Sequence, residues 1–292
     1  MTAPLVATST LSAVPAQAAT LASAFGDLHF TNFSQNFATV DSDNDGDTSG
    51  SADGGVATVY NQAVVETDDA EAWAYATSEV TGESRNYSAS AQTQATIVGN
   101  FFINAGNVFS FNFQSFLDLE AMIDEPSFEK ASAITDISFS LYDTSDIRES
   151  ALADFLDNLL SNPTSIKKNP LAFFSLAGNL NIPGRDDFLK SRKSENITFN
   201  IEDSDSNFGG NYEFASAFFA GYFQQRFNTK ANLTLVASRR TEARVVAPEP
   251  GATMALLALP VLMSTASKGR NKGTSSSGRC VDRKVTRFKV GV

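Results

Sequence analysis

The chain has 292 residues, of which 42% are hydrophobic and 19% charged, a balance typical of a globular protein rather than a disordered one. Residues 251–292 carry a net charge of +7 and the remainder a net charge of −18. An acidic body of this kind would repel phosphate groups, which argues against nucleic acid as a partner. One cysteine, Cys280, and one histidine, His29, exclude an internal disulfide bond and any metal site that needs two imidazoles.

Residues 1–18 have features of a signal peptide. The segment contains no charged residue and ends in Ala16-Gln17-Ala18, the small-x-small pattern that precedes a signal peptidase cleavage site. Its apolar core is weak and a basic n-region is missing, so two alternatives stay open: a start codon upstream of Met1, and an ordinary N-terminal extension. We expect an exported protein with signal peptidase as a partner.

Residues 19–246 form the predicted folded domain, along which apolar and polar residues alternate with period 2. In VFSFNFQ, residues 108–114, three phenylalanines fall on one face of an extended strand and polar side chains on the other. The other strand candidates are residues 26–33, 56–65, 70–79, 88–103, 137–143, 171–180, 197–201, 212–227 and 232–246. About eight to ten strands joined by Asn-, Gly-, Asp- and Ser-containing turns predict an all-β fold, a single antiparallel β-sandwich.

The stretch DSDNDGDTSG interrupts this pattern near the start of the domain. Asp41, Asp43, Asp45 and Asp47 repeat the first half of a calcium-binding loop, with Gly46 at the bend. The closing bidentate glutamate is missing, because position 12 of such a loop is Ala52. We therefore expect an acidic, solvated hairpin loop that binds Ca²⁺ weakly or not at all, rather than a true calcium site, and no resident cofactor.

One helix is predicted inside the domain, at residues 147–160, where apolar residues recur at helical spacing. Thr144 or Ser145 can cap its start, and Asn162-Pro163 ends it. We expect this helix to close one end of the sandwich; a helix that docks a partner is the alternative.

An uncharged run of 17 residues follows the domain, at residues 251–267, interrupted by Pro260. It is close to the roughly 20 residues that a membrane-spanning helix needs. Pro248-Glu249-Pro250 precedes it, and Lys268, Arg270 and Lys272 follow, as expected where the far end of a span stays in the cytoplasm.

These features together, over residues 247–272, resemble the PEP-CTERM sorting signal of exported bacterial proteins. The resemblance implies recognition and processing by an exosortase near Pro248, Glu249 and Pro250, with Lys268 and Arg270 in the basic cluster. It further implies transient anchoring in the inner membrane through a C-terminal hydrophobic helix, then display at the cell surface or in the extracellular matrix, where exopolysaccharide is a candidate partner. Residues 273–292 form a basic low-complexity tail beyond the signal.

Several stretches of the body resemble a cyanobacterial group within the PEP-CTERM class: FTNFSQ, IVGNFF, FFSLAGNLN, DFLKSRKSENIT and SNFGGN. No activity is implied by this resemblance. The residues themselves contain no catalytic motif, and we interpret His29 as a structural strand residue.

Two kinds of side chain keep other functions open. The carboxylate pairs Asp186-Asp187 and Glu202-Asp203 would suit a glycosidase if folding brought two acids into one cleft. Aromatic residues, Trp73 with Tyr75 on one strand face and Tyr212 and Tyr222 elsewhere, would suit a sugar-stacking platform. The sequence thus predicts an exported, non-enzymatic surface or matrix protein, with a carbohydrate-binding module as the alternative and a secreted hydrolase as the third hypothesis.

Overall fold

The computed structural model describes residues 19–68, 70–84, 86–148, 151, 155 and 168–248, and antiparallel strands make up most of them. These residues lie in a unit that ends at Pro250. The strands are β1 (Ala19–Thr31), β2 (Thr39–Ala52), β3 (Val56–Thr67), β4 (Ala72–Glu83), β5 (Tyr87–Ile103), β6 (Val108–Met122), β7 (Lys130–Asp143), β8 (Ala172–Ile182), β9 (Phe188–Lys193), β10 (Ile197–Asn207), β11 (Tyr212–Arg226) and β12 (Ala231–Ala247). The all-β prediction is confirmed.

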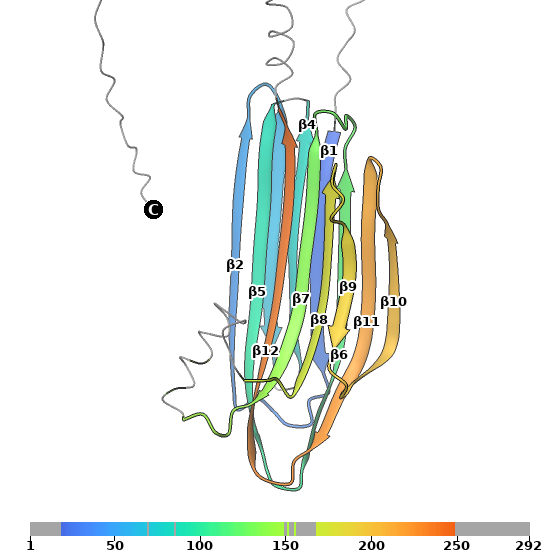
Figure 1. Cartoon of the computed structure of the whole chain (residues 1–292). Coiled ribbons are helices and arrows are strands. Elements are labelled where there is room, and N and C mark those ends of the chain that lie inside the picture. Colours follow the sequence, from blue (N-terminus) through green and yellow to red (C-terminus); the bar gives the residue numbers. More distant parts are fainter. Residues whose placement is uncertain are drawn as a thin grey trace, which may run out of the picture. The chain divides into compact units, whose positions relative to one another are not determined.

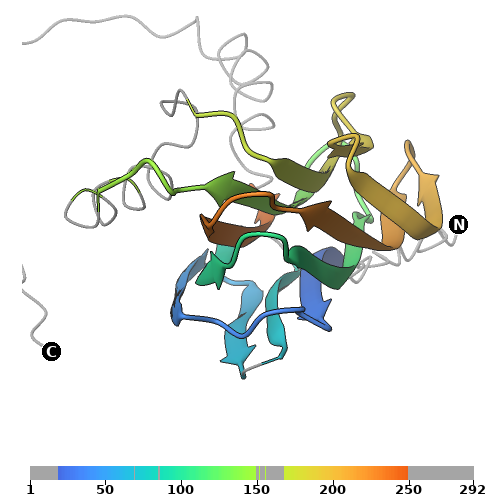
Figure 2. The same ribbon diagram turned by 90° about the horizontal axis from the view of Figure 1, so that it is seen from below.

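The strands form two six-stranded antiparallel sheets that face one another (Figures 1 and 2). The first sheet has the order β10-β11-β6-β1-β4-β3, and the second has the order β2-β5-β12-β7-β8-β9. The arrangement is a β-sandwich, as predicted, but the described residues contain twelve strands rather than eight to ten. The additional strands, β2 and β9, are short of apolar residues, which is why alternation did not reveal them.

Period-2 alternation explains why each strand lies where it does. In β1, every second residue from Thr20 to Phe30 is buried, while the residues between them are half-buried on the outer face. The same alternation runs along β4 and β6, so the inward faces of the two sheets enclose a single large apolar core.

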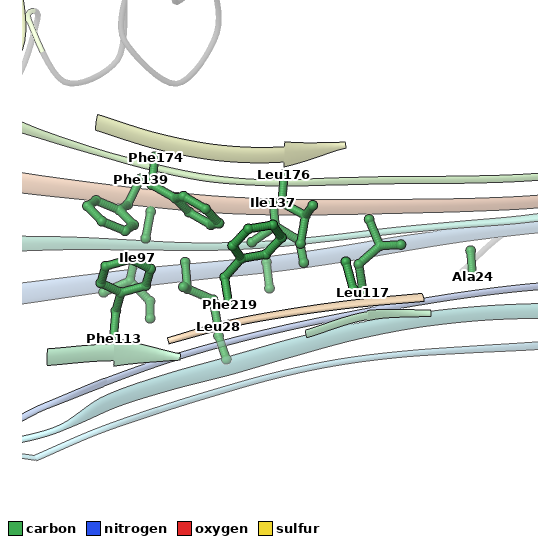
Figure 3. Packing of buried hydrophobic residues seen from close by; sticks show 14 of the residues in the cluster. Ala24, Leu28, Ile97, Phe113, Leu117, Ile137, Phe139, Phe174, Leu176 and Phe219 are labelled. Carbon is green, nitrogen blue, oxygen red and sulfur yellow. The ribbon is translucent and has the colours of Figure 1, made fainter. Parts of the chain in front are cut away.

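Phenylalanine dominates one part of this core. The ring of Phe139 on β7 lies 5.3 Å from that of Phe30, 5.0 Å from that of Phe113 and 5.7 Å from that of Phe174. Figure 3 shows three of these rings between the two layers. Such offset and edge-to-face contacts add to the free energy gained by removing the rings from water.

The structure describes only part of the predicted helix at residues 147–160. Ile147 and Arg148 are not helical, Ala151 and Phe155 are, and the other residues of the segment lie outside the described part of the chain. The ring of Phe155 lies 5.8 Å from that of Tyr142. Tyr142 belongs to the outward-facing side of β7, so Phe155 covers a part of the outer face of the second sheet.

The predicted signal-like segment and most of the predicted sorting signal also lie outside the described residues. Among the residues that the structure describes, no helix is long and apolar enough to span a membrane. The sandwich itself occupies residues 19–247, one residue more than the predicted domain.

Substituting Phe139 tests the core. We expect Phe139→Ala to lower the free energy of unfolding by about 3–5 kcal/mol. The substitution removes the contacts with the rings of Phe30, Phe111, Phe113 and Phe174 and leaves a cavity between the sheets. Phe139→Leu, which keeps most of the volume, should cost clearly less. Guanidinium unfolding measures both, and a loss below about 1 kcal/mol for the alanine variant would contradict this description of the core.

Candidate ligand-binding cleft

An open cleft of ≈ 360 Å³ lies where β1 and β3 end and β4 begins. Strand register makes it: Glu66 on β3 and His29 on β1 are both direct partners of Trp73 on β4. The three side chains therefore stand in one row on the outer face of the first sheet. The cleft is lined by His29, Glu66, Thr67, Asp68, Glu71 and Trp73.

The tight turn between β3 and β4 fixes the acidic wall of the cleft. Asp68 Oδ1 accepts hydrogen bonds from the backbone nitrogens of Ala70 (2.8 Å) and Glu71 (2.7 Å), an arrangement in which an aspartate closes its own turn. This turn brings Glu71 Oε2 to 3.5 Å from His29 Nε2. The single histidine of the chain thus lies in the cleft beside a carboxylate.

A carboxylate also fixes the indole ring of Trp73. Trp73 Nε1 donates a hydrogen bond to Asp27 Oδ1 at 2.5 Å. The Trp73 ring lies 5.1 Å from that of Tyr75, which in turn lies 6.3 Å from that of Phe25. Phe25 continues to Phe116 on β6, at 5.8 Å. A row of half-buried aromatic rings therefore leads from the cleft across the outer face of the first sheet.

A buried cation lies behind this row. Arg239 projects from β12 into the core and is fully buried, and its Nη1 donates to the backbone oxygen of Ala74. Burial lowers the pKa of Arg239 to about 9, and the charge of Asp27 partly offsets this effect. Burial also raises the pKa of Asp27, against the opposing effects of the Trp73 hydrogen bond and the charges of Arg239 and His29. Within the described chain, the Nε and Nη2 atoms of Arg239 have no hydrogen-bond partner.

The predicted acidic loop is instead a strand, which corrects the sequence-based expectation. Asp41, Asp43, Asp45 and Asp47 lie on β2, at the edge of the second sheet, paired with β5. Alternate residues of a strand are about 6.8 Å apart on one face, whereas Ca²⁺ draws its oxygen ligands to about 2.3–2.6 Å. The described residues contain no group of three or more His, Cys, Asp or Glu side chains placed to hold a metal. Weak or absent Ca²⁺ binding at β2 stays a prediction.

The two predicted carboxylate pairs do not form a shared site. Asp186 accepts a hydrogen bond from the side chain of Asn181 at 2.8 Å, which lowers the pKa of Asp186. Asp187 instead accepts from the backbone nitrogen of Asn181 and lies near Glu213 on β11. Burial raises the pKa of Glu213, and the charge of Asp187 raises it further.

The other predicted residues lie away from the cleft or outside the described residues. Glu202 and Asp203 follow one another on β10 and therefore point to opposite faces. Tyr212 and Tyr222 lie on β11, which β6 and β1 separate from β4. Pro248 follows the last strand directly. Glu249, Pro250, Lys268 and Arg270 lie outside the described residues.

Three acids of the cleft were not anticipated from the sequence. Glu66, Asp68 and Glu71 fall in the stretch ETDDAEAW, where acids crowd between two apolar strands and end at the only tryptophan of the chain. This concentration of acids next to a tryptophan was the feature of the sequence that could have indicated the cleft.

No protein-family model matches this chain, and no curated protein matches it.

Trp73 fluorescence can test the link between Trp73 and Asp27, because this is the only tryptophan. As Asp27 titrates, the acceptor of the indole N–H changes charge, so the emission should titrate with a midpoint above the usual range of an aspartate, in line with the raised pKa. Since the folded state then binds this proton more tightly than the unfolded chain, its contribution lowers stability as pH rises through the interval between the two pKa values.

Two variants control this experiment. Asp27→Asn should abolish the fluorescence step, whereas Asp41→Asn on β2 should leave it intact. An unchanged step in the Asp27→Asn protein would show that another group causes it.

Proposed function

We propose that this is an exported, non-enzymatic protein displayed at the cell surface or in the extracellular matrix after an exosortase processes it near Pro248-Glu249-Pro250. The observation that carries this proposal is the position of the two ends of the sandwich. β12 ends at Ala247, directly before the predicted sorting motif, and the described part of β1 starts at Ala19, the residue after the predicted signal peptidase site. Removing both flanking segments would leave every described strand intact.

The placement of the cleft fits display at a surface. Ala19 pairs with Glu83 at one end of β4, and Trp73 lies at the other end of that strand. Ala247 pairs with Tyr87, and the hydroxyl of Tyr87 donates a hydrogen bond to Thr20 Oγ1 at 2.5 Å. The first and last residues of the sandwich therefore lie at the same end of the domain. A protein anchored through the segment after Ala247 would carry the cleft at the far end of its domain.

The sorting motif is tested by replacing Pro248, Glu249 and Pro250 with alanine. In a host that has an exosortase, the unaltered protein should lose the segment that follows the motif, and the triple variant should keep it in the membrane fraction. Intact mass distinguishes the two products. Equal processing of both proteins would contradict the proposal.

A second candidate function, glycan binding, is favoured by the fixed orientation of Trp73. The apolar C–H face of a sugar ring packs on an aromatic ring, and carboxylates such as Glu66 and Glu71 can accept hydrogen bonds from sugar hydroxyls. Ligand sites commonly combine an aromatic wall with a few convergent polar groups of this kind. An exported protein would meet such a ligand as exopolysaccharide.

Titration with oligosaccharides from the producing cell's own exopolysaccharide tests this function, with Trp73 emission as the signal. We expect a saturable change that Glu71→Gln weakens about tenfold, the effect of losing roughly 1.4 kcal/mol from a charged hydrogen bond. Glu79→Gln, farther along the same face of β4, is the matched control. No change in emission or calorimetric heat would contradict glycan binding.

The same experiment addresses hydrolysis, because several carboxylates in one cleft is the arrangement that the hydrolase hypothesis required. The non-enzymatic proposal expects no new reducing ends during prolonged incubation. Release of reducing ends that Glu71→Gln abolishes would instead support a glycosidase.

A further inference from the structure

The first residue of β1 is held by an acidic side chain from another part of the chain. The backbone nitrogen of Ala19 donates a hydrogen bond to Asp124 Oδ2, at 2.9 Å. Asp124 lies two residues beyond Met122, the last residue of β6, in the turn to β7. This contact therefore ties the start of the domain to a turn more than a hundred residues away.

Buried groups fix Asp124 in place. Glu129 is 2% exposed, and its Oε2 accepts hydrogen bonds from the backbone nitrogens of Asp124 (2.8 Å) and Glu125 (2.9 Å). Its Oε1 lies 3.4 Å from the hydroxyl of Tyr87. Burial raises the pKa of Tyr87 to about 12, so its phenol stays neutral at physiological pH. The Asp124 carboxylate is thus presented to Ala19 by a preformed turn.

Several acidic residues belong to the segments next to the backbone nitrogen of Ala19. Glu83 is the direct strand partner of Ala19, and Asp124 is its hydrogen-bond acceptor. Glu125 and Glu129 belong to the same turn as Asp124. A peptide N–H offers the Asp124 carboxylate one dipole, whereas an α-ammonium in the same place would offer it a full positive charge.

We propose that signal peptidase cleaves the Ala18–Ala19 bond, and that the α-ammonium group released on Ala19 forms an ion pair with Asp124. In this step water breaks the peptide bond: the hydroxyl completes the carboxylate of Ala18, and the new amine takes up a proton. The inference rests on the proposed export of the protein. Its consequence is that maturation adds a charged contact between β1 and the β6–β7 turn, so the processed protein is more stable than its precursor.

The N-terminus of the protein isolated from the cells that make it is the direct test. Peptide mass spectrometry should find Ala19 as the first residue. Exported protein that begins at another residue would overturn this inference and leave the proposed export standing. Protein that stays unprocessed inside the cell would overturn both.

Stability measurements test the ion pair separately. Asp124→Asn keeps an oxygen that can accept from a peptide N–H but removes the charge. We expect this substitution to lower the melting midpoint of the processed chain by about 2 °C, the size of shift that an exposed ion pair gives in a domain of this length. In the unprocessed full chain the shift should be clearly smaller, because only a peptide N–H loses its charged acceptor there. Asp205→Asn on the distant strand β10 should affect neither form. Equal shifts in both forms would refute the ion pair.

The pH dependence gives a further check with a definite sign. The free α-amino group titrates at about 7.7–8.0 in peptides, and the acids of Glu83, Asp124, Glu125 and Glu129 should raise this pKa in the folded chain. The stabilisation is then fully present below that range and is lost as pH rises through the raised value. A difference between the processed wild type and Asp124→Asn that persists unchanged well above pH 9 would contradict the assignment.

Discussion

The structure depends on one constraint, which is that a strand can bury only alternate residues. Each sheet therefore presents one apolar face, and the two faces satisfy one another across a shared core in which Phe139 contacts rings from both layers. Because the inner faces supply the packing, the outer faces are free to carry side chains selected for other reasons. The row from Trp73 to Phe116 lies on such an outer face.

The same constraint explains which parts of the fold could be predicted from the sequence. Strands such as β6 and β12 alternate strongly and were recognised, whereas β2 is exposed at every position and is rich in Asp, Ser and Gly. It is a strand because residues 39–52 pair along their whole length with β5, not because of their own preference. The ligands at the start of a calcium-binding loop alternate with period two, and so do the side chains on one face of a strand. The spacing of the acids in β2 therefore fits both structures, and the prediction of a loop was wrong.

Acidic edges also have a structural role. β2 ends one side of the second sheet and β10 ends one side of the first, and exposed carboxylates line both. Unpaired edge strands can recruit strands from other molecules, and rows of like charge oppose this. From the sequence alone, the large negative charge of the body only argued against nucleic acid as a partner. On the edge strands it also opposes association between copies of a protein proposed to be displayed at a surface.

The cleft could not be predicted because register, rather than sequence proximity, assembles it. His29 and Trp73 are 44 positions apart and meet only because β1 pairs with β4 residue by residue from Ala19 to Phe30. The same pairing separates the cleft from the start of the domain, because it begins at Ala19, beside Asp124, and ends at Phe30, beside the cleft.

A one-residue slip of this register would turn the side chain of Trp73 into the core and that of Ala74 to the outer face. It would also move Ala74 away from the fully buried Arg239, whose Nη1 donates a hydrogen bond to the backbone oxygen of Ala74. Leaving a buried guanidinium without that partner is costly, so the buried arginine disfavours the slipped register and helps to keep the cleft on the outer face.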